Sequence, residues 1–307
     1  MKIFEKVEKN YKDNFEELGD KRFHFASRLL LWADDGFAKN KLAELKAEYI
    51  GTNDDEYSEK IKNILEEDFD SKNLLFRKEW EIFYVKYPTL RKYNKVLFRN
   101  LFCSTVYGLD LREIIGKQIK KEELIKLRDD LFADKAAIAA LSTHAINYFY
   151  TLDYYLNEEE SFFDTGIFLK LIETEEIFRD KNTAALRVYL LTHCIIGESA
   201  FYARKIARNV ETYEKMLVAL EKIINDDYAE VSLDNKVEFL VCARLCGKSS
   251  NLETKILADT MESFDAKRSY FVENGKIKNK DSFKSGEHRN VLALMAFCLK
   301  EKNKISS

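Results

Sequence analysis

One phrase occurs twice near the middle of this chain. Leu-Ser-Thr-His-Ala-Ile at 141–146 returns as Leu-Leu-Thr-His-Cys-Ile at 190–195, so His144 and His193 stand 49 residues apart. Self-similarity at a period of this size is typical of proteins built from repeated helical units, each stacked on the next. The repeat therefore predicts an array of similar units, and it also predicts which distant residues become neighbours.

Proline and glycine are scarce. The 307 residues include one proline and ten glycines, whereas turn-rich β architectures use far more of both. Apolar residues recur three and four positions apart from Phe4 to Leu18 and from Tyr213 to Ile224, so each series lies on one face of a helix. We expect an all-α fold of about twelve to fifteen helices, forming a single domain over 1–307.

A second feature follows the same period. Steps of 49 residues from Asp134, which lies ten residues before His144, reach Thr183, Ser232 and Asp281. All four residue types cap helix N-termini, because a short side-chain oxygen accepts a backbone N–H that is unpaired there. The predicted repeats run over about 134–182, 183–231, 232–280 and 281–307.

Each repeat is expected to be a helical hairpin. Its first helix, such as 184–201, is apolar almost all round and suits the inside of the array, while a more polar partner, such as 210–224, suits the outside. Hairpins arranged in this way form a closed α/α toroid or, as the alternative, an open α-solenoid. Hairpins of about 49 residues would fill the chain about six times, which favours the toroid.

Composition also restricts the location and the partners. A formal net charge of −3 gives no general attraction to nucleic acid or anionic lipid, so no nucleic-acid or membrane partner is expected. The five cysteines are odd in number and lie in apolar stretches, as reduced cytosolic thiols do. No apolar run is long enough for a membrane span. We expect a cytoplasmic protein that binds a small molecule or peptide.

The repeat predicts which side chains lie side by side on neighbouring inner helices, whose axes are about 8–10 Å apart. Ten residues after each cap, it aligns His144, His193, Cys242 and Val291. Six residues after each cap, it aligns Ala140, Tyr189, Glu238 and Glu287, with His288 beside the last.

A zinc site is one hypothesis for the first of these layers. Imidazole and thiolate are preferred zinc ligands, and His144, His193 and Cys242 would leave a fourth position open, as in catalytic sites. We expect that no cofactor binds, with zinc as the alternative, since cysteine is also a common buried residue and no short Cys-x-x-Cys pair is present.

Acid–base catalysis is the hypothesis for the second layer. Glu238 and Glu287 could act as general acid and base, as in glycosidases, with His288 as a further catalytic group. The structural alternative is a glutamate in the first turns of a helix, which the helix dipole favours. His144, Tyr189 and His193 would bind the ligand in a central cavity.

Two further sequence patterns each have a functional and a structural interpretation. Asp226-Asp227-Tyr228-Ala229-Glu230 has the Asp-Asp-x-x-Glu form of class I terpene synthases, and Asp34-Asp35 is a looser match, but paired acids near a loop are usually solvated. The aromatic clusters 148–150, 154–155 and 162–163 would suit the groove of a non-catalytic interaction module. Core packing between helices is the structural alternative for these aromatic residues.

A family resemblance covers about a third of the chain. The stretch from Arg187 to Phe201, followed by Asp234 to Gly247 with Glu238, resembles bacterial all-α, α/α-toroid-like domains of unknown function, some linked to peptide or natural-product biosynthesis. The resemblance implies a toroid with a ligand cavity. Lanthipeptide cyclases are more distantly similar, but their Cys-His-Gly signature is absent here.

These patterns predict an α-toroid protein whose central cavity binds a small molecule or peptide. Such a protein could be a peptide- or natural-product-modifying enzyme. A helical-repeat protein-interaction module without catalysis is the alternative.

Overall fold

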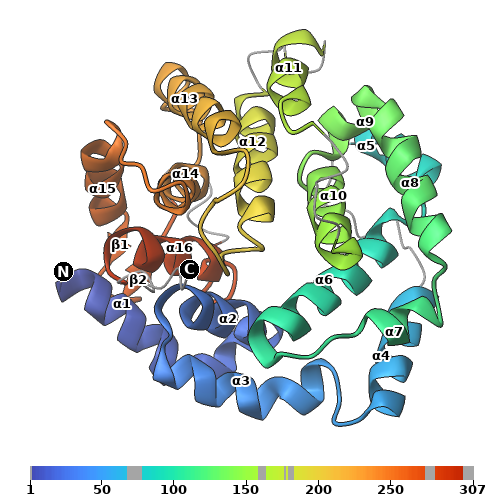
Figure 1. Ribbon diagram of the computed structural model, residues 1–307. Coiled ribbons are helices and arrows are strands. Elements are labelled where there is room, and N and C mark those ends of the chain that lie inside the picture. The colour runs from blue at the N-terminus through green and yellow to red at the C-terminus, as the bar shows by residue number, and fades with distance from the viewer. Residues whose placement is uncertain are drawn as a thin grey trace. The chain divides into compact units, whose positions relative to one another are not determined.

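The computed structural model describes residues 2–67, 78–157, 164–175, 178, 183–273 and 281–299 (Figure 1). Within these ranges the chain forms sixteen α-helices, one 3-10 helix and two strands of two residues each. The predicted all-α class is confirmed, with slightly more helices than expected. None of the described helices is both long enough and apolar enough to span a bilayer.

The chain divides into two compact units, which we call the terminal unit, Met1–Leu45 with Tyr202–Ser307, and the central unit, Lys46–Phe201. The terminal unit contains α1 (Lys2–Asp13), η1 (Phe15–Lys21), α2 (Arg22–Ala33), most of α3 (Gly36–Tyr49), α13 (Val210–Asp226), α14 (Leu233–Leu245), α15 (Glu253–Glu262), β1 (Phe264–Asp265), β2 (Tyr270–Phe271) and α16 (Glu287–Phe297). The central unit contains α4 (Asp54–Glu66), α5 (Lys78–Lys86), α6 (Leu90–Tyr107), α7 (Arg112–Gly116), α8 (Lys121–Ala133), α9 (Lys135–Leu141), α10 (Thr143–Leu156), α11 (Ile167–Thr174) and α12 (Ala184–Glu198).

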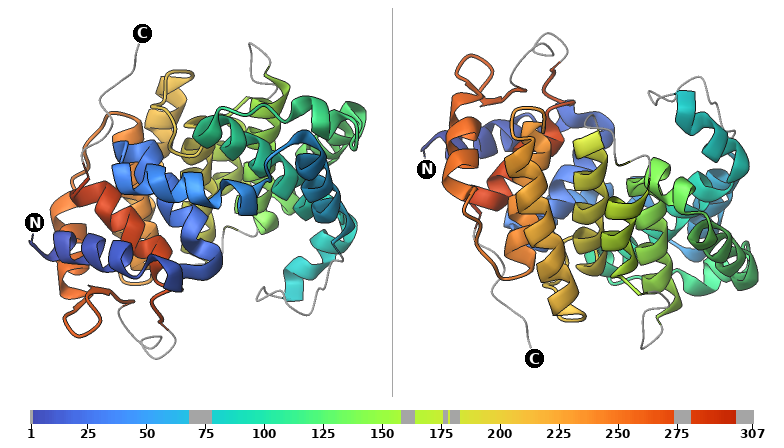
Figure 2. Two further views of the ribbon diagram at one scale, coloured as in Figure 1. Left: turned by 90° about the horizontal axis from the view of Figure 1, so that it is seen from below. Right: turned by 90° about the horizontal axis from the view of Figure 1, so that it is seen from above.

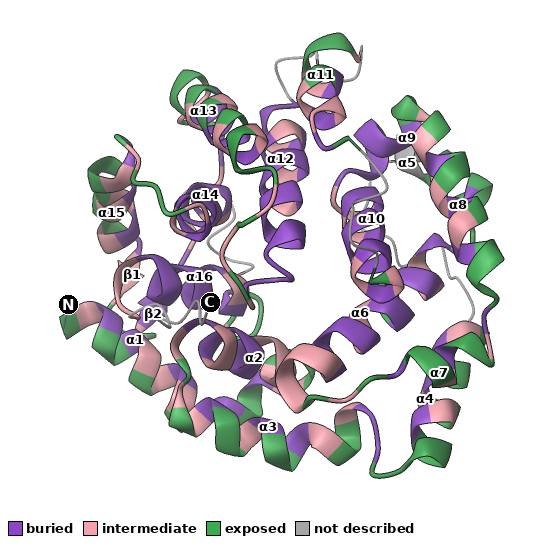
Figure 3. Ribbon diagram, in the orientation of Figure 1, coloured by how far each residue is buried: buried purple, intermediate pink, exposed green. Residues whose placement is uncertain are grey.

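The pair α14 and α16 forms the centre of the terminal unit. Both helices are buried on nearly all sides, whereas α13 and α15 keep exposed outer faces (Figure 3). This is the predicted division between an apolar inner helix and an amphipathic partner. Helices α1 and α2 also pack against α16, and the ring of Tyr11 stacks on Phe283 at 4.3 Å between centroids.

Helix α10 is the centre of the other unit. It packs against both α6 and α12, and the right-hand view of Figure 2 shows the yellow-green ribbons of α10 and α12 side by side. Tyr148, Phe149 and Tyr150 are at most 3% exposed, so this cluster belongs to the core. The cluster at 162–163 and the acidic run at 158–160 lie outside the described residues.

The predicted cap series is right at two of its four positions. Asp134 accepts a hydrogen bond from Ala137 N at 3.0 Å, and Ser232 accepts one from Asn235 N at 3.3 Å. Thr183 occupies the N-cap position of α12, but its side chain forms no capping hydrogen bond there. Asp281 is wrong as a cap, because α16 begins only at Glu287 after an N-cap at Gly286.

The first predicted repeat also differs from a simple hairpin. Its apolar stretch is interrupted at Ser142, where φ is +41°, so that α9 ends before α10 begins. His144 is therefore the second residue of α10 rather than a residue deep in one continuous helix.

The acidic pairs resembling a terpene-synthase motif have structural roles or face solvent. Asp35 accepts a hydrogen bond from Ala38 N at 2.9 Å and pairs with Lys12 at 2.7 Å. Asp226 is exposed at the C-terminal end of α13. All five cysteines are free thiols, as expected.

Candidate acid–base site

Two histidine–glutamate pairs lie next to each other in the terminal unit. His24 Nδ1 is 2.8 Å from Glu287 Oε1, and His288 Nε2 is 3.3 Å from Glu238 Oε2. The two imidazole rings meet edge to face with their centroids 5.5 Å apart. Four ionisable groups from distant parts of the sequence thus form one cluster.

The packing of α16 explains how the cluster forms. His24 comes from α2, Glu238 from α14, and the adjacent residues Glu287 and His288 from the first turn of α16. Successive residues of a helix point about 100° apart. Because α16 packs against both α2 and α14, its carboxylate can meet the histidine of α2 while its imidazole meets the glutamate of α14.

Burial separates the carboxylates from the imidazoles. The side chains of Glu287 and Glu238 are 0% and 2% exposed, whereas those of His24 and His288 are 24% and 37% exposed. Each imidazole is therefore accessible to solvent, and the carboxylate that it contacts is buried. In catalytic dyads and triads a buried carboxylate in this position orients the imidazole and stabilises its protonated form.

His24 is a neutral base at neutral pH. Its pKa is lowered to about 4, mainly by burial and also by the nearby Arg28 charge, and the attraction of Glu287 only partly opposes these two effects. A neutral imidazole that donates Nδ1–H to Glu287 keeps its lone pair on Nε2. That nitrogen makes no hydrogen bond within the described ranges, so it can accept a proton.

His288 has the opposite tendency. Burial lowers its pKa, but the hydrogen bond and charge of Glu238, together with the charges of Asp234 and Glu287, outweigh burial and raise the pKa above 6.5. His288 therefore holds a proton more readily than a free imidazole does. Two adjacent imidazoles whose pKa values are pushed apart match the general rule for assigning an acid and a base.

Glu287 is an ionised carboxylate that accepts few hydrogen bonds. Burial alone would raise its pKa, but His24, His288 and Arg28 together lower it. Its Oε2 atom is buried and has no hydrogen-bond partner among the residues that the structure describes. A buried carboxylate with one unsatisfied oxygen favours positive charge on its neighbours, so Glu287 can stabilise an imidazolium at His24.

The predicted catalytic residues are brought together, and one residue of the cluster was missed. Glu238, Glu287 and His288 lie in one cluster, as the repeat predicted. The structural alternative for these glutamates fits only Glu287, because Glu238 is the sixth residue of α14 and lies beyond its first turn. His24 is no multiple of 49 residues from the repeated histidines, so the period could not find it.

The predicted ligand-binding residues form a separate group in the central unit. His193 Nδ1 lies 2.7 Å from Asn147 Oδ1 of α10, while Asn94 donates a hydrogen bond to the backbone oxygen of His144 at 2.7 Å. Burial, with Arg91 and His193, lowers the pKa of His144 to about 4. Tyr189 is half-buried in α12.

The third predicted zinc ligand belongs to a different unit from the other two. Cys242 is a buried residue of α14 in the terminal unit, whereas His144 and His193 belong to the central unit. Over the described ranges, no three or more His, Cys, Asp or Glu side chains are grouped in a way that could hold a metal ion.

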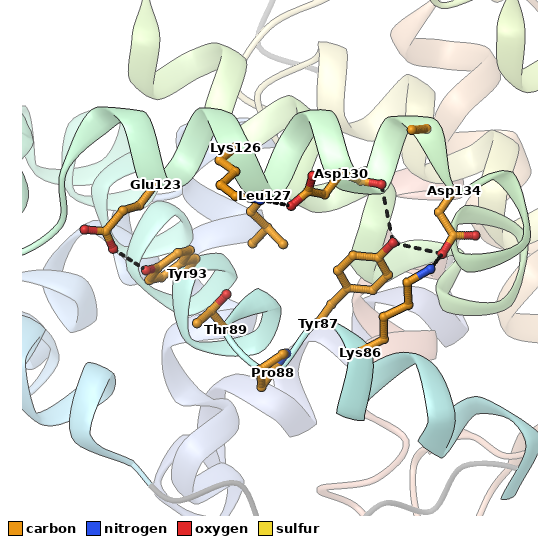
Figure 4. A pocket seen from close by; sticks show the side chains of 11 residues that line it. Lys86, Tyr87, Pro88, Thr89, Tyr93, Glu123, Lys126, Leu127, Asp130 and Asp134 are labelled. Atoms are coloured by element: carbon orange, nitrogen blue, oxygen red, sulfur yellow. Dashed lines mark hydrogen bonds and ion pairs between the residues drawn. The ribbon is translucent and has the colours of Figure 1, made fainter.

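A pocket of about 710 Å³ lies in the central unit, and none of these predicted residues lines it (Figure 4). It is formed by the turn at 86–89 and one face of α8. Its polar groups bind one another: Tyr93 donates to Glu123 at 3.0 Å, and Tyr87 donates to Asp134 at 2.8 Å. The volume suits a small ligand, but the lining shows no arrangement for catalysis.

No family model, curated protein or solved structure matches this chain. The side-chain geometry of the two histidine–glutamate pairs is therefore the main guide to its function.

Proposed function

We propose that this protein is an enzyme that uses general acid–base catalysis on a small molecule or peptide. His24 is the base and His288 the acid, each oriented by a buried glutamate. The observation that carries the proposal is the pair of adjacent imidazoles whose pKa values are shifted in opposite directions. This combination serves a reaction in which one proton leaves the substrate and another enters it.

Each residue has a defined part in such a step. Nε2 of His24 takes a proton from the substrate or from water, and the carboxylate of Glu287 stabilises the resulting imidazolium. His288 donates its proton to the leaving or rearranging group, while Glu238 keeps it oriented. Acid–base groups of this kind each contribute typically about 10²- to 10⁴-fold to the rate.

The first test is an NMR titration of the imidazoles. The chain has only four histidines, so single His→Gln variants assign every resonance. We expect His24 to titrate near 4 and His288 above 6.5. If both titrate near 6.5, the proposed division into base and acid is wrong.

The second test is activity. A panel of chromogenic esters, phosphodiesters, glycosides and peptides would be assayed with the wild type and with His24→Gln and His288→Gln. Each variant should lose roughly 100-fold or more of any activity found. Lys215→Gln, which breaks an exposed ion pair with Glu211 on α13, is the control and should retain full activity. Equal rates in all variants would contradict the assignment.

A non-catalytic interaction module is the second candidate. The observation that favours it is the pocket between the 86–89 turn and α8, whose rim carries both lysines and carboxylates. In this case a peptide or small molecule would bind there without turnover. Substitutions in the pocket would then abolish binding, while His24→Gln and His288→Gln would leave it unchanged.

Three further proposals rest on the sequence. They are a closed α/α toroid with a central cavity (alternative: an open α-solenoid), a cytoplasmic location, and kinship with domains linked to peptide or natural-product biosynthesis. Small-angle scattering distinguishes the toroid from the solenoid.

We propose that no cofactor binds, with zinc at His144, His193 and Cys242 as the alternative. Metal analysis of untagged protein tests it, and about one equivalent of zinc would support the alternative.

A further inference from the structure

Two ion pairs join the same two helices at the acid–base site. The first is the contact of His288 in α16 with Glu238 in α14, at 3.3 Å. The second joins Nε of Arg289, the next residue of α16, to Oδ1 of Asp234 in α14 at 2.6 Å. Asp234 and Glu238 are four residues apart and therefore lie on one face of α14. The two pairs thus connect the same stretches of the two helices.

Both positive partners lie where a helix disfavours positive charge. His288 and Arg289 are the second and third residues of α16. At this end of a helix the unpaired backbone N–H groups and the helix dipole favour negative charge. The carboxylates of Glu238 and Asp234 offset this effect, because each supplies the opposite charge to one of the two side chains.

The pair with Asp234 is the shorter and the more buried of the two. The side chains of Arg289 and Asp234 are 6% and 29% exposed, whereas that of His288 is 37% exposed. A short, charge-assisted hydrogen bond restrains the geometry of its partners more than a long one does. The start of α16 is therefore held on α14 chiefly by Arg289, and the more exposed imidazole is brought to Glu238 as the next residue along.

We propose that Asp234 is a positioning residue of the acid–base site, whose bond to Arg289 fixes the first turn of α16 on α14 so that His288 lies beside Glu238. The charge of Asp234 also favours the protonated form of His288 and contributes to its raised pKa. The inference rests on the proposed acid–base function, because it assigns a role within the same site. No sequence pattern had given Asp234 a role.

The first test is Asp234→Asn, which keeps the size of the side chain and removes its charge. The amide binds Arg289 less strongly and no longer favours a proton on His288, so the pKa of His288 should fall by about half a unit or more in the NMR titration. Arg289 keeps its contacts with Asp281 and Glu273 in this variant, so the protein should remain folded, which circular dichroism checks.

Asp234→Glu is the conservative variant. It retains the carboxylate, so the pKa of His288 should stay above 6.5, as in the wild type. The charged and titratable groups that surround the two imidazoles, besides the imidazoles themselves, are Arg28 of α2, Asp234 and Glu238 of α14, and Glu287 and Arg289 of α16.

Glu273→Gln is the matched control. Glu273 also binds Arg289, through Nη2 at 3.1 Å, but it follows β2 and does not belong to α14. Each of the two variants, Asp234→Asn and Glu273→Gln, removes one negative charge from the same buried arginine, so both should lower the free energy of unfolding in urea. Only Asp234→Asn should lower the pKa of His288.

The outcomes separate this inference from the proposed function. A fall in the pKa of His288 in Asp234→Asn, with no fall in Asp234→Glu or Glu273→Gln, supports the inference. If Asp234→Asn loses stability but keeps the pKa of His288, Asp234 only stabilises the fold and this inference alone fails. If His24 and His288 both titrate near 6.5 in the wild type, the proposed function fails whatever the variants show.

Discussion

At the scale of single residues, one buried arginine holds several acidic groups together. Arg289 is 6% exposed, and its guanidinium lies 2.6 Å from Asp234, 2.7 Å from Asp281 and 3.1 Å from Glu273. It also donates a hydrogen bond to the backbone oxygen of Phe271 at 3.2 Å. This one residue of α16 thus ties the helix to α14, to β2 and to the segment before α16.

Replacing Arg289 should lower the free energy of unfolding. Arg289→Met would leave three carboxylates close together without their cation, and Asp281 is only 5% exposed. Removing one partner of a buried ion pair typically destabilises a protein by about 3–5 kcal/mol. We expect a loss of this size in the free energy of unfolding at pH 7, measured with urea. Lys215→Met, which removes only an exposed pair with Glu211, should change it by about 0.5 kcal/mol or less.

Arg289 also explains why the predicted N-cap at Asp281 is wrong. Asp281 was predicted to cap a helix because of its type and its place in the 49-residue series. In the fold its carboxylate accepts hydrogen bonds from Arg289 and from Glu273 N at 2.7 Å, so it is engaged elsewhere. A capping residue can be recognised by type, but a competing buried cation eight residues later cannot be recognised from local sequence.

At the scale of helices, the periodic pattern predicted which faces are buried better than where helices end. The apolar series from Tyr213 to Ile224 is the buried face of α13, as expected. The break at Ser142 was not predicted, because apolar residues occur on both sides of it and the flanking sequence carries no glycine or proline. Apolar periodicity reports burial, whereas breaks depend on how the neighbouring helices pack.

A glycine determines how closely two of these helices pack. A Cβ atom added to Gly197 of α12 would lie 2.4 Å from Cγ of Tyr150 on α10, well inside van der Waals contact. Gly197→Ala should therefore push the helices apart and cost about 1–3 kcal/mol, although alanine's higher helix propensity returns up to about 1 kcal/mol. Thermal unfolding measures the change. Gly36→Ala, where nothing lies within 4 Å, should be neutral or stabilising; an equal loss in both would contradict the packing argument.

At the scale of the whole molecule, composition determined the fold class but not the pairing of distant segments. The scarcity of proline and glycine correctly predicted an all-α chain. The contact of His24 with Glu287 joins residues 263 positions apart, and it arises because the first helices pack with the last ones in the terminal unit. Local periodicity contains no information about such a pairing. The site was therefore predicted only as far as the repeat reached, to Glu238, Glu287 and His288.

Each unit contains one histidine whose lowered pKa should make stability depend on pH. The pKa values of His24 and His144 are lowered from 6.5 to about 4 in the folded protein. The unfolded chain therefore binds more protons than the folded chain between these values, and stability falls as pH falls from about 6.5 to about 4. His288 acts in the opposite direction, because its pKa is raised and its contribution is lost as pH rises.

The contribution of His144 can be measured by substitution, because burial is the largest cause of its lowered pKa. At pH 4.5 its protonation in the unfolded chain should cost about 2–3 kcal/mol of folding stability, at 1.36 kcal/mol per pKa unit. In His144→Gln that cost is absent. Urea unfolding at pH 7 and pH 4.5 should therefore show a smaller loss on acidification in the variant than in the wild type, by about this amount. Equal losses in the two proteins would mean that His144 titrates normally when the protein is folded.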